Sequence, residues 1–437
     1  MTARFLLPLF LLLGSLCAGL ASGVSGKVEP LPASRQPALY HDLEAELGRV
    51  LGFWTQPALR HPGPGGFRVH LDAQLRPTGH APQNLIVHLR MLYQYALALA
   101  LVPERKAELE PEYERQLDFL FTRFWDAEKG GWFWALDEKG APADRSKKSV
   151  GEVYAIYILA ELHRLKADPR TLDYAIRTYD LLEPAWDTPY GGYFDAREEP
   201  WDSRANLRKQ NGTNLHMVLA LSRLYPLRPE ARLRERLEAL YVILRDRFVH
   251  PNGNGYYALT RDLKPITQPL EWEDGGLNVI TCYGHNLEML WYLLDGAVAL
   301  GKDPRELKPY WEQLLKGFDA YGLRDGVAVN YIGPIDGPTE DTRILWWSQN
   351  EAMIAFLRLY ELTGDAGHLA TFERISRWSL DRMAADGSGC WISIIDLSGK
   401  PVENPYRGGD NWKVDFHVTR ALEEIAKTSQ RLAKKAL

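Results

Sequence analysis

The sequence has no excess of basic residues, which argues against a nucleic-acid partner. Its 52 Lys and Arg are outnumbered by 57 Asp and Glu, for a formal net charge of −5. Nucleic-acid-binding domains usually carry a clustered positive charge that meets the phosphates. With 46% hydrophobic and 25% charged residues over 437 positions, the composition is that of a globular protein with a large core.

The N-terminus has an apolar run, residues 5–13, which is too short for a comfortable membrane span. Arg4 precedes this run, and small residues follow it, with a plausible cleavage site at residues 19–21. The pattern predicts a signal peptide over residues 1–21, a linker over residues 22–37, and export to the periplasm or the exterior. We favour cleavage over lipidation at Cys17, because Leu16 stands where a small residue is expected.

Cysteine is scarce, and tight metal-ligand motifs are missing. Removal of the signal peptide leaves only Cys282 and Cys390, which could pair in an oxidising compartment, and the sequence does not decide whether they do. No motif such as His-Glu-x-x-His occurs. We therefore predict no metal and no cofactor, with a site made of His216, His285 and His417 as the alternative.

Aromatic residues are plentiful, and many of them follow glycines that recur along the chain at nearly even intervals. The recurring turns contain Gly66, Gly131, Gly192, Gly255, Gly326 and Gly389. Each interval is long enough for two helices and a short β-turn excursion, so the chain reads as an internal repeat of helical hairpins.

Helical periodicity fits that unit. The first helices are predicted near 38–54, 107–126, 170–186, 230–249, 304–321 and 366–385. The second helices are predicted near 82–101, 149–166, 210–224, 284–300, 346–363 and 412–433. Six such hairpins can bury one another in a closed ring. We therefore predict an all-α (α/α)6 barrel over residues 38–433, with the second helices inside and the turns at one rim; an open superhelix is the alternative.

The segment 283–288 places His285 and Glu288 three residues apart at the start of a predicted helix, so the two side chains share a face. A carboxylate beside an imidazole can accept a ring N–H, fix the tautomer and raise the pKa. This pattern favours an oriented general acid/base. A helix N-terminus with a structural histidine is the alternative.

Other polar or aromatic residues occupy similar places near the starts of the predicted inner helices. Arg90, His216, His285, Trp347 and His417 each follow the preceding glycine turn at a similar distance along the chain. Equivalent positions in a ring of repeats share one rim, so we expect these side chains to converge. Taken singly, each could instead be structural: Arg90 could pair with a buried carboxylate, and His216 could cap a helix.

Three segments together resemble the N-acylglucosamine 2-epimerase family, and most closely its members that act on cellobiose. Gly284-His285-x-x-Glu288 is similar to that family's Gly-His-Asp-Ile-Glu. Trp346-Trp347-x-Gln349-x-Glu351-Ala352 is similar to its Trp-Trp-Pro-Gln-Ala-Glu-Ala. Trp412-Lys413-x-x-Phe416-His417-x-x-Arg420 is similar to its Trp-Lys-x-x-Tyr-His-x-x-Arg. The sequence departs from the cellobiose-acting members at Val150, Gly212 and Ser348, where Tyr, Asn and Pro are expected.

The resemblance implies epimerisation at C2 of a reducing-end mono- or disaccharide, by ring opening and proton transfer through an enediolate. It implies that His285 and His417 are the acid/base pair, that His216 assists ring opening and that Glu288 supports His285. It also implies a set of substrate-holding residues, namely Arg90, Trp346, Trp347, Glu351, Trp412 and Arg420. Two imidazoles on different helices suit this reaction independently, because imidazole titrates near neutrality.

Three other functions remain open from the sequence. An aldose–ketose isomerase would use the same enediolate. A glycoside hydrolase would need two carboxylates about 5–9.5 Å apart, for which Glu288 and Glu351 are the candidates. A catalytically inert sugar-binding protein would not need the His285–Glu288 pair. The sequence leaves the sugar and the oligomeric state open.

Overall fold

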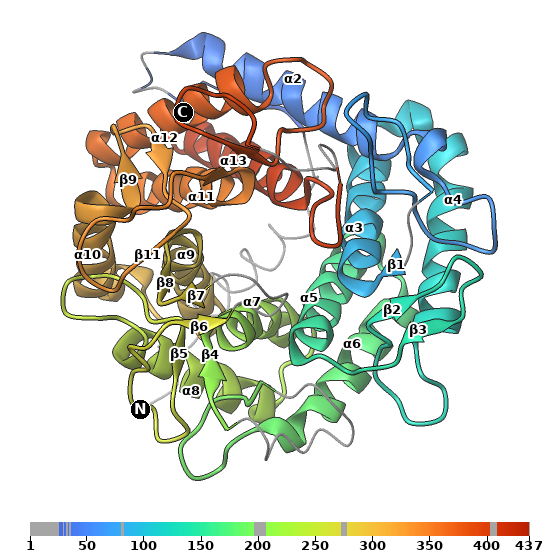
Figure 1. The fold of residues 1–437 in the computed structure, drawn as a ribbon, viewed down its shortest axis with the longest axis horizontal. Helices are drawn as coiled ribbons and strands as arrows, with labels where there is room; N and C mark the ends of the chain where they lie inside the picture. The colour runs from blue at the N-terminus through green and yellow to red at the C-terminus, as the bar shows by residue number, and fades with distance from the viewer. Residues whose placement is uncertain are drawn as a thin grey trace, which may run out of the picture.

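The computed structural model describes residues 26–28, 30–31, 34, 36–79, 83–195, 207–271, 278–402 and 409–436. The predicted signal peptide, with its cleavage site and Cys17, lies outside the described residues. Within them, helices form two concentric rings around a central axis (Figure 1). The predicted (α/α)6 barrel is confirmed.

Outer and inner helices alternate along the chain. The outer ring contains α2 (Pro37–Trp54), α4 (Lys106–Phe119), α6 (Pro169–Leu182), α8 (Ala231–Arg247), α10 (Lys308–Gly317) and α12 (Ala366–Met383). The inner ring contains α3 (Leu85–Leu101), α5 (Ser149–Lys166), α7 (Asn211–Leu227), α9 (Tyr283–Ala299), α11 (Trp346–Thr363) and α13 (Phe416–Ala436). Single-turn segments adjoin them at η1 (Pro57–Leu59), η2 (Pro103–Arg105), η3 (Leu120–Phe124), η4 (Glu183–Ala185), η6 (Pro304–Leu307) and η7 (Phe318–Gly322).

The two rings differ in burial because they have different neighbours. Inner helices are packed on all sides, so α3 is buried from Leu85 to Leu99, whereas outer helices such as α6 bury one stripe only. Inner-to-outer connections are short. Gly364, at φ 71°, ends α11, and the Asp365 carboxylate then accepts the Gly367 N–H at 2.7 Å to start α12.

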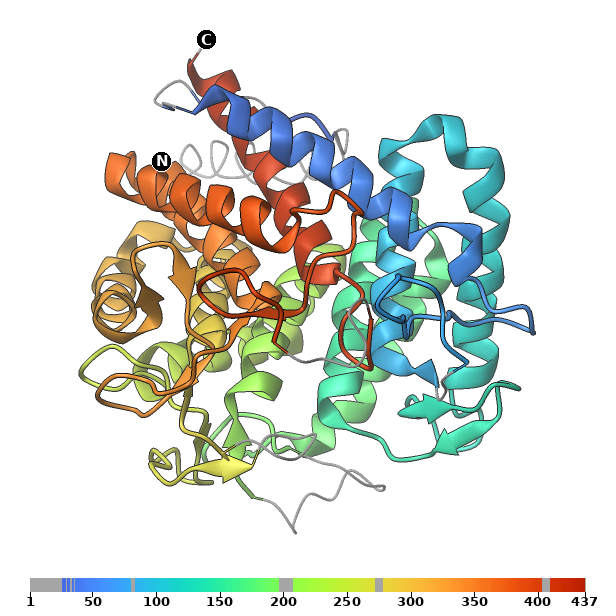
Figure 2. The same ribbon diagram turned by 45° about the horizontal axis from the view of Figure 1, so that its top comes forward.

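Two- and three-residue strands gather at one end of the barrel (Figures 1 and 2). They are β1 (Gln83–Asn84), β2 (Ala135–Leu136), β3 (Pro142–Asp144), β4 (Lys209–Gln210), β5 (Ala258–Leu259), β6 (Leu270–Glu271), β7 (Asn278–Val279), β8 (Thr281–Cys282), β9 (Leu323–Arg324), β10 (Ala328–Val329), β11 (Ile332–Gly333), β12 (Ile344–Leu345) and β13 (Ile394–Ile395).

Four of these strands come directly before an inner helix and pair with the excursion of the next hairpin. The antiparallel pairs are β1 with β2, β4 with β5, β8 with β11 and β12 with β13. The pairs tie the first residue of each of these inner helices to the neighbouring repeat. They therefore set the depth at which those helices start in the ring.

The glycine turns are held by one recurring hydrogen bond to an inner helix. In three repeats, the side-chain oxygen of the fourth residue of the helix accepts a backbone N–H from the preceding excursion at 2.8 Å. The pairs are Glu152 with Trp132, Asn214 with Tyr193, and Gln349 with Val329. Trp132 and Tyr193 directly follow Gly131 and Gly192, so the recurring turn in the sequence corresponds to a recurring contact.

The last inner helix starts at Phe416, so the prediction that residues 412–415 belong to it is wrong. The Asp410 carboxylate accepts the backbone N–H groups of Trp412 and Lys413, both at 2.7 Å, and closes a turn there. Asp415 then adopts a left-handed φ of 49°. Lys413 and Asp415 form a fully buried ion pair at 3.1 Å, not the solvated charges of a helix start.

The described part of the predicted linker, residues 22–37, packs on the barrel. Val28 and Leu31 are each 2% exposed and belong to the hydrophobic core. Cys282 and Cys390 are both buried, and no disulfide joins them. Among the described residues, no single helix is long and apolar enough to cross a membrane; the bent pair Leu85–Leu101 and Pro103–Phe124 meets that test by length and composition together.

Alternating charges close into a circuit lower on the inner helices, and we call this circuit the basal ion ring. The thirteenth residues of α5, α7, α9 and α11 are Glu161, Arg223, Asp295 and Arg358, and consecutive members pair at 2.6 to 2.7 Å. The circuit is completed by three residues of α13 and by the arginine of α5, in the order Glu424, Lys427, Glu423 and Arg164.

Asp295 is a member of the basal ion ring whose loss should be costly, because it pairs with two arginines at 2.6 Å and is 7% exposed. Asp295→Ala leaves Arg223 and Arg358 without this shared partner. We expect the free energy of unfolding, measured by urea titration, to fall by about 3 kcal/mol. Asp173→Ala breaks an exposed pair with Arg177 and should change it little. Equal effects of the two substitutions would contradict a structural role for the ring.

Candidate functional site

Every inner helix contributes side chains to one polar cluster near its N-terminal end. Arg90, Tyr154, His216, Glu288 and Glu351 are each the sixth residue of their helix, and Arg420 is the fifth of α13. Nearer the helix starts lie His285, Trp347 and His417, each the second or third residue. The cluster therefore has two layers about one helical turn apart.

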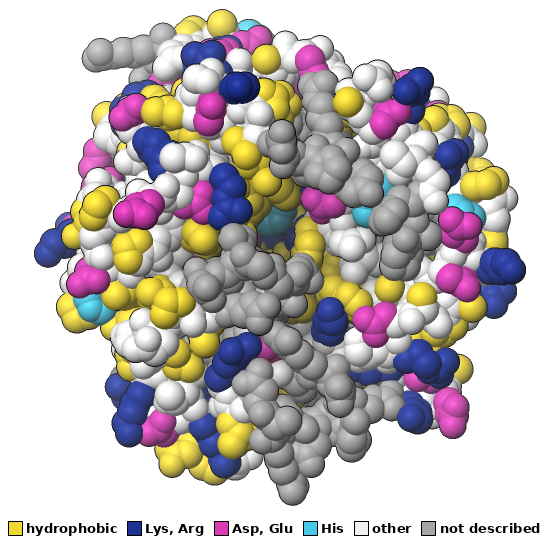
Figure 3. Space-filling model, in the orientation of Figure 1, with side chains coloured by type: hydrophobic (Ala, Val, Ile, Leu, Met, Phe, Trp, Pro, Cys, Tyr) yellow, Lys and Arg dark blue, Asp and Glu magenta, His cyan; other side chains and the backbone are white. Residues whose placement is uncertain are grey.

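The cluster faces the end of the barrel that carries the strands. Figure 3 shows a hollow at the centre of this face, with histidine at its floor and hydrophobic side chains on its sides. His216, His285 and His417 are 5%, 8% and 6% exposed, so a ligand in the hollow would reach their edges. Most of each ring is enclosed by protein.

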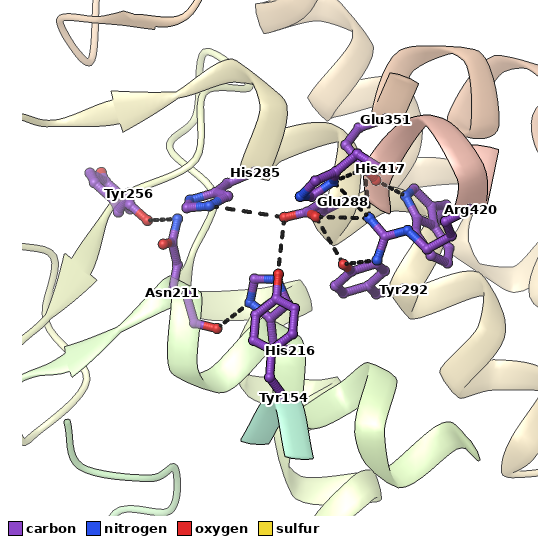
Figure 4. Close-up of polar contacts among 12 residues, drawn as sticks. Tyr154, Asn211, His216, Tyr256, His285, Glu288, Tyr292, Glu351, His417 and Arg420 are labelled. Atoms are coloured by element: carbon purple, nitrogen blue, oxygen red, sulfur yellow. Dashed lines mark hydrogen bonds and ion pairs between the residues drawn. The ribbon is translucent and has the colours of Figure 1, made fainter. Parts of the chain in front are cut away.

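His417 has a defined tautomer. Its Nδ1–H donates to Glu351 Oε1 at 2.7 Å (Figure 4). This leaves Nε2 with the lone pair, 3.3 Å from the Arg90 guanidinium. His216 is fixed in the same way. Its Nδ1–H donates to the Gly212 carbonyl at 2.6 Å, and its Nε2 lies 3.1 Å from the Tyr154 hydroxyl. Each ring therefore presents an unprotonated Nε2 within the cluster.

Arg420 joins the two buried carboxylates. Its guanidinium lies 2.6 Å from Glu351 Oε1 and 3.3 Å from Glu288 Oε1, and it also donates to the Tyr292 hydroxyl at 3.1 Å. Trp291 Nε1–H donates to Glu351 Oε2 at 3.0 Å. Both oxygens of Glu351 are thus hydrogen-bonded within the protein, beneath the histidines.

The pKa values of the two carboxyl groups shift in opposite directions, because Arg420 contacts both but lies closer to Glu351. Burial and the nearby charge of Glu351 raise the pKa of Glu288 to about 8. Burial also opposes ionisation of Glu351, but Arg420 and the His417 hydrogen bond outweigh it and hold the pKa of Glu351 below its usual range. These shifts favour an ionised Glu351 and a protonated Glu288 at neutral pH.

Glu288 does not support His285 in the way that the spacing predicted. The closest approach between His285 Nε2 and Glu288 Oε2 is 3.9 Å, beyond hydrogen-bond distance. Burial lowers the pKa of His285 to about 4, so the expected rise in that pKa is wrong. Glu288 Oε2 lies 3.8 Å from His216 Nε2 as well, and it has no hydrogen bond within the described part of the chain.

The two tryptophans that open α11 lie in different surroundings. The Trp347 ring lies between the two upper histidines, with its centroid 5.3 Å from that of His285 and 5.7 Å from that of His417. The Trp346 ring instead faces the Lys413 ammonium at 5.6 Å. Adjacent helical residues point about 100° apart, which explains the difference.

Trp412 lies in the turn before α13 and not on the helix. Its carbonyl accepts a hydrogen bond from the Arg90 guanidinium, and its ring centroid lies 5.8 Å from that of Trp134. It therefore flanks the hollow above Arg90.

Two tyrosines of the cluster were missed by the sequence analysis. The Tyr154 hydroxyl contacts both His216 Nε2 and the Arg90 guanidinium, the latter at 2.8 Å, and the Tyr292 hydroxyl donates to Glu288 Oε1 at 2.9 Å. The signal for Tyr154 was present, because it follows its glycine turn at nearly the same distance along the chain as Arg90 and His216 follow theirs. Tyr292, four residues after Glu288 on the same helix face, was the corresponding signal in α9.

The cluster also contains the one arrangement of metal-ligating type found among the described residues. Ligand atoms of Glu288, Glu351 and His417 lie within 4.8 Å of one another. The Arg420 guanidinium already lies within hydrogen-bond distance of both carboxylates and supplies positive charge there. The three histidines named as an alternative ligand set do not form such a group.

Comparisons with known proteins agree with this geometry. A cellobiose 2-epimerase of Bacteroides fragilis is 26% identical over 406 residues, which cover 89% of this chain and 98% of that protein. The structure of the cellobiose 2-epimerase from Spirochaeta thermophila superposes with a TM-score of 0.79 at 27% identity, covering 92% of this chain and all of that one. A Bacteroides thetaiotaomicron α-mannanase has a TM-score of 0.61 at 13% identity, a likeness of fold alone.

The family model for N-acylglucosamine 2-epimerase matches residues 65–421, from the first glycine turn to the residue after Arg420. The match spans the barrel and includes every member of the polar cluster. The chain belongs to the N-acylglucosamine 2-epimerase family.

Proposed function

We propose that the protein is a carbohydrate 2-epimerase that acts on the reducing end of a cellobiose-like disaccharide. The observation that carries this proposal is the placement of two neutral imidazoles, His285 on α9 and His417 on α13, on either side of Trp347. The relatives that match nearly full length are cellobiose 2-epimerases, which supports the choice of reaction and of sugar.

Epimerisation at C2 requires an open-chain aldose, removal of the C2 proton and return of a proton to the opposite face. His216 is the group for ring opening, because its unprotonated Nε2 faces the cluster and can take the proton of the anomeric hydroxyl. The Arg90 guanidinium then stabilises the oxygen that becomes negative in the enediolate. Trp347 stacks on the sugar between the two imidazoles.

Of the two acid/base histidines, His417 is the one whose protonated ring has a carboxylate within hydrogen-bond distance. Burial lowers its pKa to about 3, so it is neutral and ready to accept a proton. Once it takes the C2 proton, the ionised Glu351 on its Nδ1 side stabilises the positive charge. Glu351 and Arg420 thus act through His417 as positioning residues. The resemblance in sequence implied that Glu351 and Arg420 hold the substrate, whereas in this proposal they position His417.

His285 transfers the proton on the opposite face of C2. The carboxyl of Glu288 is the nearest group that can supply His285 with a proton. The carboxyl oxygen and the imidazole Nε2 are 3.9 Å apart, so a small side-chain movement brings them into hydrogen-bond distance. Two arginines against one ionised carboxylate leave the site with an excess of positive charge, which suits an enediolate intermediate.

The hydrolase alternative conflicts with these contacts. A glycosidase needs its two carboxyl groups to flank the scissile bond. Here the Arg420 guanidinium bonds to both carboxylates, and Glu351 is fully buried.

His285→Ala and His417→Ala should each lower kcat by about 10²-fold or more, because each removes a positioned proton-transfer group. Wild-type product formed from cellobiose in deuterated water should carry deuterium at C2, because the proton passes through an exchangeable imidazole. Mass spectrometry and NMR of the product measure the label. Trp347→Ala, as a matched change of a residue that contacts both histidines, should chiefly raise KM.

Near-normal epimerisation by both histidine variants would refute the acid/base assignment. Release of two monosaccharides without label at C2 would instead indicate hydrolysis. A labelled ketose product would indicate aldose–ketose isomerisation.

Glu288 should give the protein a characteristic dependence of stability on pH. The fold raises its pKa from 4.5 to about 8, so the contribution of the neutral carboxyl is full below about pH 4.5 and is lost as the pH rises through 8. Relative to Glu288→Gln, which stays neutral, the wild-type free energy of unfolding should fall with rising pH by up to about 1.4 kcal/mol per pH unit. Urea titrations of both proteins between about pH 5 and pH 8 measure this difference.

The matched control is Glu161→Gln, because Glu161 is a buried carboxyl of the basal ion ring whose wild-type pKa is lowered instead. The difference between wild type and this variant should not show the same fall. A pH-independent difference between wild type and Glu288→Gln would contradict a protonated Glu288.

We also propose that the protein is exported through residues 1–21, since Arg4, the apolar run 5–13 and the small residues after it follow the order of a signal peptide. N-terminal mass spectrometry of the protein from its native host should find the chain processed near residue 21 outside the cytoplasm. An intact N-terminus in the cytoplasmic fraction would contradict export.

A further inference from the structure

The Tyr154 hydroxyl lies between a histidine and an arginine of the polar cluster, and its hydrogen bonds have defined directions. Because the Nδ1–H of His216 donates to the Gly212 carbonyl, His216 Nε2 is an acceptor, and the Tyr154 O–H donates to it at 3.1 Å. The Tyr154 oxygen in turn accepts from the Arg90 guanidinium at 2.8 Å. Figure 4 shows the two rings together beside Glu288, and their centroids are 4.8 Å apart. Tyr154 and His216 thus form a pair that can give one proton and take another.

The surroundings keep each member of this pair in the protonation state that such an exchange needs. Burial raises the pKa of Tyr154, while the charge of Arg90 opposes that rise, so the hydroxyl is protonated at neutral pH. Burial lowers the pKa of His216 well below its ordinary value, so the ring is neutral. The Arg90 guanidinium also stabilises the negative charge that the Tyr154 oxygen acquires when its proton leaves. An acid and a base therefore lie 3.1 Å apart.

The hydroxyl of Tyr154 is not needed to orient His216. The Gly212 carbonyl, at 2.6 Å from Nδ1, already fixes the tautomer and the direction of the ring. The Tyr154 ring is 3% exposed, and a phenylalanine ring would fill the same space. What the hydroxyl adds at this position is a transferable proton next to the unprotonated Nε2 of His216.

The pair borders the two histidines that are proposed to act on C2. The centroid of the His216 ring lies 6.3 Å from that of His285. The Arg90 guanidinium, which contacts Tyr154, also lies 3.3 Å from His417 Nε2. In an aldose, C1 is bonded to C2, so the groups that act on the oxygens of C1 have to lie beside the groups that act on C2. The pair occupies such a place and shares no proton-transfer atom with the two histidines.

We propose that Tyr154 and His216 form a complete acid/base pair for ring opening and closure, and that the protein therefore interconverts the anomers of its substrate as an activity separate from epimerisation. Tyr154 is then a catalytic residue that protonates the ring oxygen. The inference rests on the proposed function for the class of substrate, a reducing aldose, but it does not depend on any chemistry at C2.

Ring opening moves one proton from O1 of the sugar to the ring oxygen O5. His216 Nε2 takes the O1 proton as the C1=O bond forms, and the C1–O5 bond breaks while O5 takes the proton of the Tyr154 hydroxyl. The resulting imidazolium and phenolate lie 3.1 Å apart, so the proton passes from Nε2 to the phenolate oxygen and restores the pair. The reverse steps, after rotation about the C1–C2 bond, close the ring to the other anomer.

Tyr154→Phe, which removes only the hydroxyl, tests the pair, and freshly dissolved β-cellobiose is the probe. NMR of the anomeric protons follows the approach to anomeric equilibrium above the rate without protein, and it resolves anomers from epimers. The substitution is made in the wild type and in the double variant His285→Ala/His417→Ala, in which C2 chemistry is blocked. Tyr113→Phe is the matched control, because Tyr113 is a fully buried tyrosine of the outer helix α4 whose hydroxyl has no hydrogen bond within the described part of the chain.

The wild type and the double histidine variant should both accelerate anomer interconversion. Tyr154→Phe should lower kcat for this reaction by about 10²-fold in either background, because a positioned acid is lost. KM should stay within about twofold, since the ring of residue 154 remains in place. Tyr113→Phe should match its parent. Unchanged interconversion in Tyr154→Phe, or no acceleration by the double histidine variant, would overturn the proposal.

The same experiment separates this inference from the proposed function, because epimers and anomers are measured together. If the wild type interconverts anomers through Tyr154 but forms no C2 epimer, the proposed function fails and the pair stands. If the wild type forms the epimer while Tyr154→Phe forms it at the same rate and interconverts anomers normally, the proposed function stands and the pair is refuted.

Discussion

The site depends on one buried arginine that is shared by two carboxylates. Water is excluded from Arg420, Glu288 and Glu351, all of which are at most 2% exposed, so like charges repel strongly there and one guanidinium cannot balance two anions. The protein satisfies this constraint by keeping one carboxyl protonated. The ionised Glu351 then orients His417, and the neutral Glu288 faces His216 and His285 without attracting a proton to either ring.

The barrel makes this arrangement possible by bringing six helices to the same depth. Strand pairs between neighbouring hairpins fix several of the helix starts, so the sixth residues of five inner helices meet on one level. The thirteenth residues of four of them meet about 10 Å deeper in the basal ion ring. A closed ring of repeats thus converts equal sequence positions into a converging set of side chains. One level forms part of the polar cluster, and the deeper level forms part of the basal ion ring.

The architecture could be predicted because its causes are local and repeated. The glycine turns mark a backbone contact made in several repeats, and apolar periodicity marks the helices. The depth of each residue could not be predicted from the glycine turns, since the excursions differ in length. Counting from the glycines placed His285 and His417 on the level of Arg90 and His216, whereas they lie about one turn nearer the mouth. The same counting places Tyr154 on the level of Arg90 and His216, but Tyr154 belongs to none of the motifs that were singled out and was missed. The motifs assigned Glu351 and Arg420 to substrate binding, although both lie beneath the histidines.

Other errors came from contacts that join distant parts of the chain. The turn at 410–415 ends the helical pattern because Asp415 accepts from Trp54 and the Trp391 N–H and pairs with Lys413, and a sequence window around residue 415 contains neither tryptophan. The spacing of His285 and Glu288 was read correctly as a shared face. The expected rise in the His285 pKa was wrong, because burial lowers that pKa more than the charge of Glu351 raises it. Burial and Glu351, which lies on the next inner helix, also raise the pKa of Glu288, so its carboxyl has less negative charge to act on His285.

The protonation of Glu288 is the central claim, and infrared difference spectroscopy of the carboxyl groups at neutral pH tests it most directly. The account predicts a C=O band of a buried protonated carboxylic acid that is present in the wild type and lost in Glu288→Gln. The band should weaken in Glu351→Gln, because the charge of Glu351 helps to keep the proton on Glu288. Absence of the band from the wild type, or its persistence in Glu288→Gln, would contradict the account.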